Sequence, residues 1–148
     1  MASEFEGEWG SNLGTPSQNE GNLRITDLNN GNVVVQHFEN GAPTLEDGSG
    51  RIFLNETPQR IVIQRIRRNG VIMIYHGTLD LNPQPPPPDI RKRINGRFIR
   101  ITLGVDLTGA LQFNVAPPDD WTGNIPPPPP PDEGKLIDRD QASNKSKK

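Results

Sequence analysis

The chain has 148 residues, of which 31% are hydrophobic and 23% are charged, and its formal net charge is −2. This length accommodates one domain together with tails. Because the chain contains no cysteine, its composition excludes disulfides, thiolate nucleophiles and metal or haem sites built on cysteine.

The start of the chain, MASEFEGEWG, is acidic and lacks the apolar core of a secretory signal. The longest apolar run, Val71–Tyr75, has five residues, whereas a membrane helix needs about 18. We therefore expect a cytoplasmic protein that does not span a membrane.

Composition divides the chain into three parts. Residues 1–21 contain few large apolar side chains, and residues 117–148 combine a proline run with a polar, charged stretch. Such segments bury too little apolar surface to offset the entropy that ordering costs. We expect a flexible N-terminal segment at 1–21, one β domain at 22–116 and a disordered tail at 117–148.

Asn-Gly pairs, four in all, punctuate the central part of the chain. This dipeptide favours the type I′ turn of a two-residue hairpin, because both residues tolerate positive φ. In chain order, these turns predict hairpins that join 23–28 to 32–38, 60–67 to 71–81, and 90–94 to 97–103. A further hairpin is expected between Thr102 and Val115, around the loop Asp106–Gly109.

The predicted fold is all-β: a small antiparallel barrel or a two-sheet sandwich of about seven to nine strands. A two-residue turn at Asn69-Gly70 would make both faces of its hairpin apolar, so a second sheet, a tail or a partner must cover the outer one. Self-association into homo-oligomers is one such solution. The predicted core comprises Leu23, Ile25, Val35, Ile61, Ile63, Ile72, Ile74, Ile99, Ile101, Leu103, Leu111 and Phe113.

Motifs for catalysis are missing from the sequence, which has neither a nucleophile elbow nor a phosphate-binding loop. The two histidines, His37 and His76, are expected to be structural, since a metal site needs three or four ligands. We therefore expect a non-catalytic protein without a cofactor. Asp80 and Asp106, at equivalent places in two similar segments, are the remaining candidates for a catalytic carboxylate pair.

Positive charge is concentrated in residues 59–104, which contain nine basic and two acidic residues and so carry +7. One face of the hairpin predicted at 90–103 carries Arg91, Arg93, Phe98 and Arg100. Arginines interleaved with an aromatic side chain are typical of polyanion sites. RNA, single-stranded DNA or an acidic protein is the expected partner, unless acidic residues of the same chain neutralise these arginines.

Two proline runs, Pro85–Pro88 and Pro126–Pro131, interrupt and follow the predicted strands. Consecutive prolines adopt polyproline II, the conformation that SH3, WW and similar domains bind. The second run is therefore a candidate ligand for a polyproline-recognising domain, with a plain spacer as the alternative.

Gly7-Glu8-Trp9 resembles the G-x-W of the first strand of lipocalin- and avidin-like barrels, and Trp121-Thr122-Gly123 stands where the last strand of such a barrel would close. The resemblance covers these two tripeptides, and the avidin-type spacing of Trp, Asn and Leu-Gly is not kept. It implies a barrel whose floor Trp9 closes beneath a small apolar ligand. The candidate interior residues are Trp9, Tyr75 and Trp121.

The function expected from these observations is a binding or self-associating scaffold module without catalytic activity. Polyanion binding through the hairpins at 59–104 is the alternative.

Overall fold

The computed structural model describes residues 3–83 and 90–127. This part of the chain forms ten β-strands, and none of its segments is a helix long and apolar enough to cross a membrane. The strands are β1 (Gly7–Leu13), β2 (Gln18–Asp27), β3 (Asn32–Glu39), β4 (Ala42–Pro43), β5 (Gly48–Phe53), β6 (Arg60–Ile66), β7 (Ile72–Asp80), β8 (Lys92–Val105), β9 (Leu111–Val115) and β10 (Asp119–Ile125).

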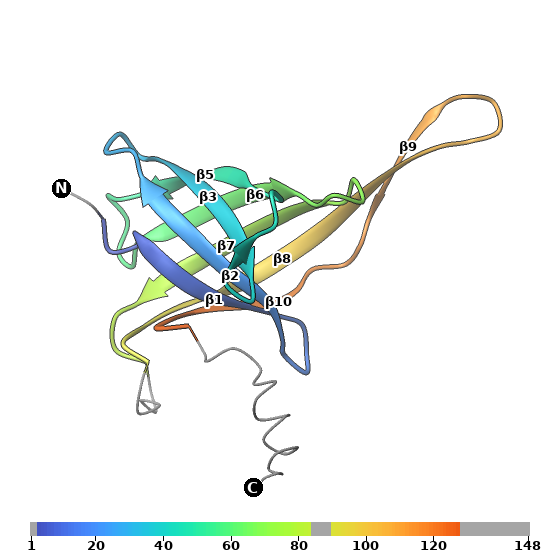
Figure 1. Ribbon diagram of the computed structural model, residues 1–148. Coiled ribbons are helices and arrows are strands. Elements are labelled where there is room, and N and C mark those ends of the chain that lie inside the picture. Colours follow the sequence, from blue (N-terminus) through green and yellow to red (C-terminus); the bar gives the residue numbers. More distant parts are fainter. Residues whose placement is uncertain (1–2, 84–89, 128–148) are drawn as a thin grey trace, which may run out of the picture.

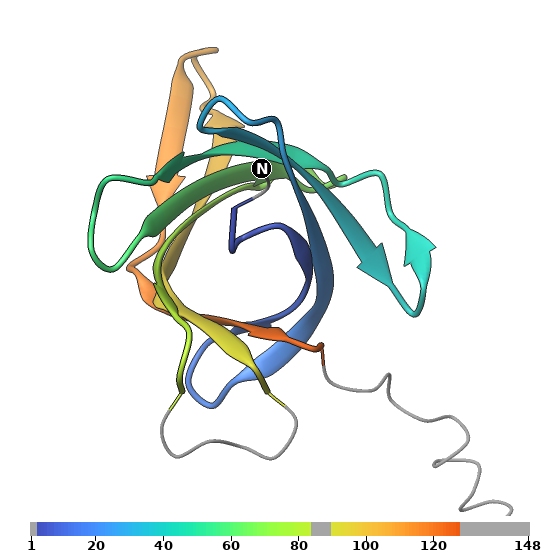
Figure 2. The same cartoon turned by 90° about the vertical axis from the view of Figure 1, so that its left-hand side faces the viewer.

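Eight of these strands close into an antiparallel barrel in the order β1-β2-β3-β5-β6-β7-β8-β10 (Figure 1; Figure 2). Closure comes from β10, which pairs with β1 on one side and with β8 on the other. The short β4 pairs with β3, and β9 pairs with the end of β8. The all-β prediction is confirmed, and the barrel is the architecture observed.

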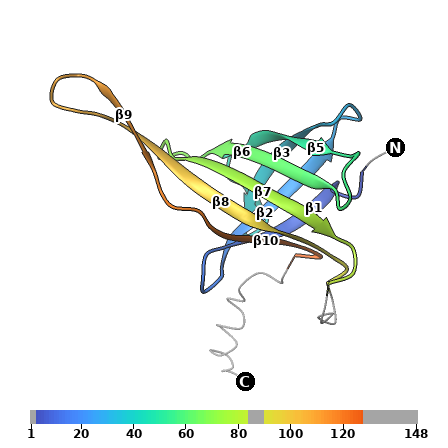
Figure 3. The same ribbon diagram turned by 180° about the vertical axis from the view of Figure 1, so that it is seen from behind.

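The two ends of the barrel differ. The end where the chain enters β1, which we call the N-terminal end, carries the connections 28–31 and 54–59. The opposite end, which we call the mouth, carries the connections 14–17, 40–47 and 67–71. From the mouth projects a hairpin arm, residues 101–115, made of the last part of β8, a turn and β9 (Figure 1; Figure 3).

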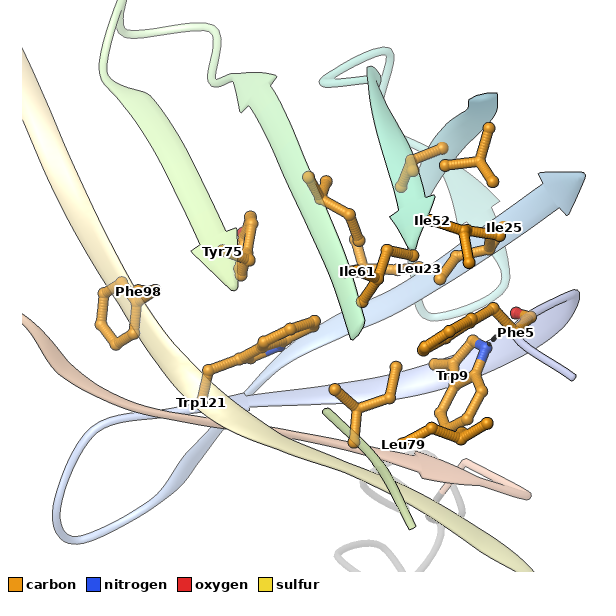
Figure 4. Close-up of a cluster of buried hydrophobic side chains, with 14 of the residues drawn as sticks. Phe5, Trp9, Leu23, Ile25, Ile52, Ile61, Tyr75, Leu79, Phe98 and Trp121 are labelled. Atoms are coloured by element: carbon orange, nitrogen blue, oxygen red, sulfur yellow. Dashed lines mark hydrogen bonds between the residues drawn. The ribbon is translucent and has the colours of Figure 1, made fainter. Parts of the chain in front are cut away.

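Apolar side chains from all eight barrel strands fill the interior. At the N-terminal end, Phe5 and Trp9 pack inside, and the Trp9 Nε1 donates a hydrogen bond to the Phe5 carbonyl oxygen at 2.7 Å (Figure 4). Nearer the mouth, the Trp121 and Tyr75 rings lie 5.0 Å apart between centroids. The barrel is therefore a packed core rather than an open tube.

The predicted domain boundaries at residues 22 and 116 are wrong. β1 and the first part of β2 precede residue 22, β10 follows residue 116, and all of them belong to the barrel wall. Trp9 and Trp121 explain the discrepancy, because each is 1% exposed and so brings one very large buried side chain to an otherwise polar segment. Residues 128–148 of the predicted tail lie outside the described residues.

The hairpin predicted around Asn95-Gly96 does not form. Both residues lie inside β8, a continuous strand of 14 residues. A Cβ on Gly96 would lie 1.9 Å from the carbonyl oxygen of His76 on β7, so the glycine permits close approach of two strands rather than a turn. Consequently the segments predicted as paired strands, 90–94 and 97–103, do not pair with each other.

The hairpin at Asn69-Gly70 forms, but its register differs from the prediction. Ile66 pairs with Ile72, which leaves the five residues 67–71 as the loop. A shift of one residue in register changes which side chains of two strands share a face. The inner face therefore carries Ile61, Ile63, Met73 and Tyr75, and the outer face carries Val62, Ile66, Ile72 and Ile74.

Five predicted core residues are buried: Leu23, Ile25, Val35, Ile61 and Ile63. Another four, Ile72, Ile74, Ile99 and Ile101, are half-buried on the outer wall. The prediction is wrong for Leu103, Leu111 and Phe113, which lie on the arm and are between 53% and 69% exposed. Their alternation does mark a hairpin, but that hairpin extends away from the core.

Candidate functional site

A β-bulge directs a carboxylate into the barrel. Ser11 pairs with Gly21 whereas Asn12 pairs with Asn19, so Glu20 is an extra residue in β2. Gly21 has a φ of 106°, and a Cβ on it would lie 2.5 Å from the carbonyl oxygen of Phe38. Glycine beside the bulge thus allows β3 to approach while the Glu20 side chain turns inward.

Glu20 is the centre of a buried polar network. The Arg65 Nη2 donates to its Oε1 at 2.7 Å, while the Tyr75 hydroxyl and the Ser11 Oγ donate to its Oε2 at 2.9 Å and 2.6 Å. Arg65 Nε also donates to the Tyr75 oxygen at 2.9 Å, and Trp121 Nε1 donates to the Ser11 Oγ at 2.9 Å. Arg65 is only 1% exposed, so this is a buried ion pair held in place by hydrogen bonds on both sides.

A second carboxylate, Glu46, extends the network toward the connection 40–47. Its Oε1 lies 3.4 Å from Arg65 Nη1, and its Oε2 accepts a hydrogen bond from the Arg68 backbone N–H at 3.0 Å. His37 is also buried, with Nε2 2.7 Å from the Glu20 carbonyl oxygen and Nδ1 2.7 Å from the Thr44 Oγ1. Because a carbonyl only accepts, His37 carries a proton on Nε2.

The pKa shifts follow from burial and these partners. Burial raises the pKa of the Tyr75 hydroxyl well above its ordinary value, and the Glu20 carboxylate raises it further, so Tyr75 remains a hydrogen-bond donor. Burial alone would lower the pKa of Arg65, but Tyr75 and Glu20 outweigh burial and raise it. Burial alone would raise the pKa of Glu46, but the Arg68 backbone N–H and the Arg65 guanidinium lower it.

Replacing Glu46 with glutamine should weaken the fold more at neutral than at acid pH. A carboxyl whose pKa is lower in the folded state stabilises the fold above its unfolded value, ordinarily 4.5, and this contribution is lost as the pH falls through the folded pKa. Glu46→Gln should lower the free energy of unfolding by about 1–3 kcal/mol near pH 7 and by less near about pH 3.5. Urea unfolding at both pH values measures the difference.

The matched control is Glu39→Gln on the exposed end of β3, which should change the unfolding free energy by at most about 0.5 kcal/mol at either pH. An equal loss for Glu46→Gln at both pH values would contradict the stabilising role of its charge.

A cavity of about 420 Å³ lies at the mouth and shares Glu20 with the network. Arg67 reaches it from the connection 67–71, Phe98 and Arg100 from β8, and Asp119 from β10. The cavity therefore combines two guanidinium groups with two carboxylates beside the root of the arm.

The arm has one apolar and one polar face. Its register pairs Ile101 with Val115, Leu103 with Phe113, and Val105 with Leu111. Directly paired side chains share a face, so these six residues make up what we call the arm's apolar face. The opposite, polar face carries Thr102, Gly104, Gln112 and Asn114.

The polarity of β8 reverses at the mouth. Inside the barrel, Ile94 and Phe98 point inward and are buried, whereas the apolar residues beyond the mouth, Leu103 and Val105, stand at outward-facing positions. Since side chains alternate along a strand, the arm's polar face continues the inner wall and its apolar face continues the outer wall. Arg100 stands at the reversal, with its guanidinium carbon 4.9 Å from the centroid of the Phe98 ring.

The outer wall beside the arm is also apolar. Ile101 pairs with Ile72 and Ile99 pairs with Ile74, so β7 and β8 present isoleucines next to each other. Ile66, paired with Ile72 on the other side, is 59% exposed. We call this continuous surface the apolar stripe; it consists of the arm's apolar face together with Ile66, Ile72, Ile74 and Ile99.

The four predicted polyanion-binding residues do not share a face. Arg91 and Arg93 lie at the N-terminal end, where Arg93 Nε donates to the Asn124 Oδ1 at 3.0 Å. Phe98 is buried inside the barrel, and Arg100 lies at the mouth. The predicted arrangement is wrong because β8 is one strand, and polyanion binding stays a prediction of the sequence.

The predicted interior residues Trp9, Tyr75 and Trp121 do lie inside the barrel, each at most 1% exposed (Figure 4). Trp9 lies at the N-terminal end of the barrel, where its Nε1 bonds to the Phe5 carbonyl oxygen. All three pack against other side chains of the core. A small apolar ligand among them stays a prediction.

Asp80 and Asp106 lie at opposite ends of the molecule, so the predicted carboxylate pair is wrong. Asp80 ends β7 at the N-terminal end, and Asp106 lies in the turn of the arm, where its Oδ1 accepts a hydrogen bond from the Thr108 hydroxyl at 2.6 Å.

His76 is exposed, with Nε2 3.3 Å from Arg60 Nη1. Pro85–Pro88 and residues 128–131 of the second proline run lie outside the described residues.

Sequence reasoning missed Glu20, Arg65 and Glu46 as members of one site. Arg65 had a usable signal, because it follows Ile61 and Ile63 at a spacing of two and so belongs to the inner face. The bulge at Glu20 has only the neighbouring Gly21 as a local mark, and Glu46 joins through a connection rather than a strand.

Comparison of the chain with family models, with curated proteins and with solved structures found no match.

Proposed function

We propose that the protein is a self-associating scaffold module in which the apolar stripes of two copies pack against each other. The observation that carries the proposal is the arm, which holds five large apolar side chains at 53–69% exposure on a single face. Apolar surface of this kind is costly in water unless another surface covers it. The occupant is a second copy of this chain.

The exposed area suits a dimer. At about 100 Å² for each of its six exposed side chains, the stripe offers on the order of 600 Å², to which its four half-buried isoleucines add. This approaches the ~800 Å² that each partner contributes to a standard interface. A monomer's largest apolar patch is commonly about 300–600 Å². The stripe is thus large enough for a stable interface between two copies.

The composition of the arm suits a symmetric contact. In a two-fold dimer the same patch occurs on both sides, so a charge within it would face its own copy. All six residues of the arm's apolar face are uncharged. Moreover, an isolated two-stranded hairpin is only marginally stable, and packing two arms face to face would supply each with a second layer.

Substitution of Phe113 by asparagine tests the proposal. Burial of a phenylalanine-sized side chain contributes about 1.5–3 kcal/mol, and a symmetric dimer loses that contribution twice. Phe113→Asn should therefore raise the dimer dissociation constant at least about a hundredfold. Sedimentation equilibrium over a range of concentrations measures the constant for both proteins, and circular dichroism checks that the barrel is retained.

Leu54→Asn provides the matched control, because Leu54 is 46% exposed but lies in the connection 54–59 at the N-terminal end. It should leave the dissociation constant unchanged. A wild-type protein that stays monomeric at high micromolar concentration would overturn the proposal, as would equal weakening by the Leu54 and Phe113 substitutions.

A further inference from the structure

Two arginines, Arg67 and Arg100, line the cavity at the mouth. In residues 3–83 and 90–127, neither Arg67 nor Arg100 forms an ion pair with a carboxylate. Arg67 Nε is buried and, among the same residues, has no hydrogen-bond partner. A buried donor without an acceptor is costly, so the cavity offers a place where an acceptor from outside the chain would be stabilised.

The carboxylates of the cavity leave this positive charge largely uncompensated. Glu20 is neutralised by Arg65, whose Nη2 lies 2.7 Å from the Glu20 Oε1. Asp119 is the other acidic lining residue; its Oδ1 accepts a hydrogen bond from the Asp120 backbone N–H at 2.7 Å. Glu46 lies 3.4 Å from Arg65 Nη1 and 3.9 Å from Arg68 Nε, and the charge of Arg67 also acts on it. Counting Arg65, Arg67, Arg68 and Arg100 against Glu20, Glu46 and Asp119 leaves one net positive charge at the mouth, which favours an anionic ligand.

The geometry also restricts how the ligand binds. The Arg100 guanidinium lies against the Phe98 ring, which fixes the plane of the guanidinium and reduces the entropy lost when it binds a carboxylate. Asp119, which pairs with Phe98 on the neighbouring strand, and Gln18 also line the cavity. The Asp119 carboxylate can accept hydrogen bonds from hydroxyl groups, and the Gln18 amide can accept or donate them. A volume of about 420 Å³ lies within the range of small-ligand sites.

From these observations we infer that the mouth cavity is a binding site for a small hydroxylated carboxylate of the sugar-acid class. Arg67 and Arg100 bind the carboxylate, and Asp119 and Gln18 bind hydroxyl groups. The lining of the cavity contains no residue of the apolar stripe, so ligand binding and dimer formation are independent of each other.

Titration of the full chain with D-glucuronate, followed by calorimetry, tests the inference. We expect saturable binding at millimolar or lower concentrations, with D-glucose binding at least about tenfold more weakly because it lacks the carboxylate. Arg67→Gln and Arg100→Gln should each weaken glucuronate binding by about tenfold or more. Sedimentation of both variants should match the wild type, which separates a failure of this site from a failure of the dimer.

Arg51→Gln is the matched control, since Arg51 is an exposed arginine on β5 outside the cavity. Its affinity for glucuronate should equal that of the wild type. The inference is overturned if glucuronate shows no saturable binding, if glucose binds equally well, or if Arg51→Gln weakens binding as much as Arg67→Gln does.

Discussion

Replacement of Arg65 by methionine should lower the free energy of unfolding by about 3–5 kcal/mol, the loss typical of removing one partner from a buried ion pair. Methionine keeps much of the side-chain volume, so the loss of stability comes from removing the charge rather than from opening a cavity. Without the guanidinium, the side-chain donors that Glu20 keeps among the described residues are the Tyr75 and Ser11 hydroxyls, and its charge is left uncompensated in the barrel. Urea unfolding of the variant and the wild type measures the difference.

Two further variants make this result interpretable. In the double variant Arg65→Met/Glu20→Gln the uncompensated charge is gone, so part of the loss should be regained. Arg97→Met removes an exposed ion pair, in which Arg97 Nε lies 3.6 Å from Asp120 Oδ1, and should cost at most about 1 kcal/mol. A loss for Arg65→Met as small as that for Arg97→Met would contradict a role for the buried network in stability.

Asn-Gly pairs in the sequence predict some of the turns of this fold. The prediction fails where contacts with a distant strand determine the local conformation. Asn40-Gly41 has positive φ at both residues, 51° and 81°, and makes the turn that such a pair predicts. Asn95-Gly96 has the same two residues but belongs to a strand, because β7 passes so close that only glycine fits. Local preference cannot distinguish these cases, since the deciding contact is with His76, about twenty residues away in the sequence.

The composition of the two end segments fails to predict that they are barrel strands, for a related reason. Residues 7–13 and 119–125 are polar on average, yet Trp9 and Trp121 make them barrel strands, and Ser11 uses its hydroxyl to link Trp121 to Glu20. An average over a segment gives no weight to one fully buried tryptophan. The single tryptophan of Gly7-Glu8-Trp9 is a better guide to β1 than the apolar content of the first 21 residues.

Alternation along a strand identifies apolar faces but not which side of a sheet is covered. Leu111, Phe113 and Val115 alternate with polar residues as a core strand would, but their partner strand has already left the barrel. The pattern is the same for a surface packed inside one chain and a surface packed between two chains. In the proposed dimer the arm's apolar face is a surface of the second kind, and the polarity of β8 reverses where the strand leaves the barrel wall and enters the arm.

Gly96→Ala should be among the most damaging single substitutions in the chain, although it adds only one methyl group. The new Cβ would lie 1.9 Å from the His76 carbonyl oxygen and 2.6 Å from the Gly77 Cα, both of them backbone atoms that cannot rotate away. β7 and β8 would have to separate where β10 also pairs with β8, and overpacking of this kind costs about 3 kcal/mol or more.

The control for Gly96→Ala lies on the same strand. A Cβ on Gly104, in the arm, meets nothing within 4 Å. Gly104→Ala should leave the free energy of unfolding unchanged or raise it by a few tenths of a kcal/mol up to about 1 kcal/mol, because alanine restricts the unfolded chain. Thermal and urea unfolding of the two variants compares them directly. Equal stability of the two proteins would show that β7 and β8 are not held as close together at Gly96 as the barrel requires.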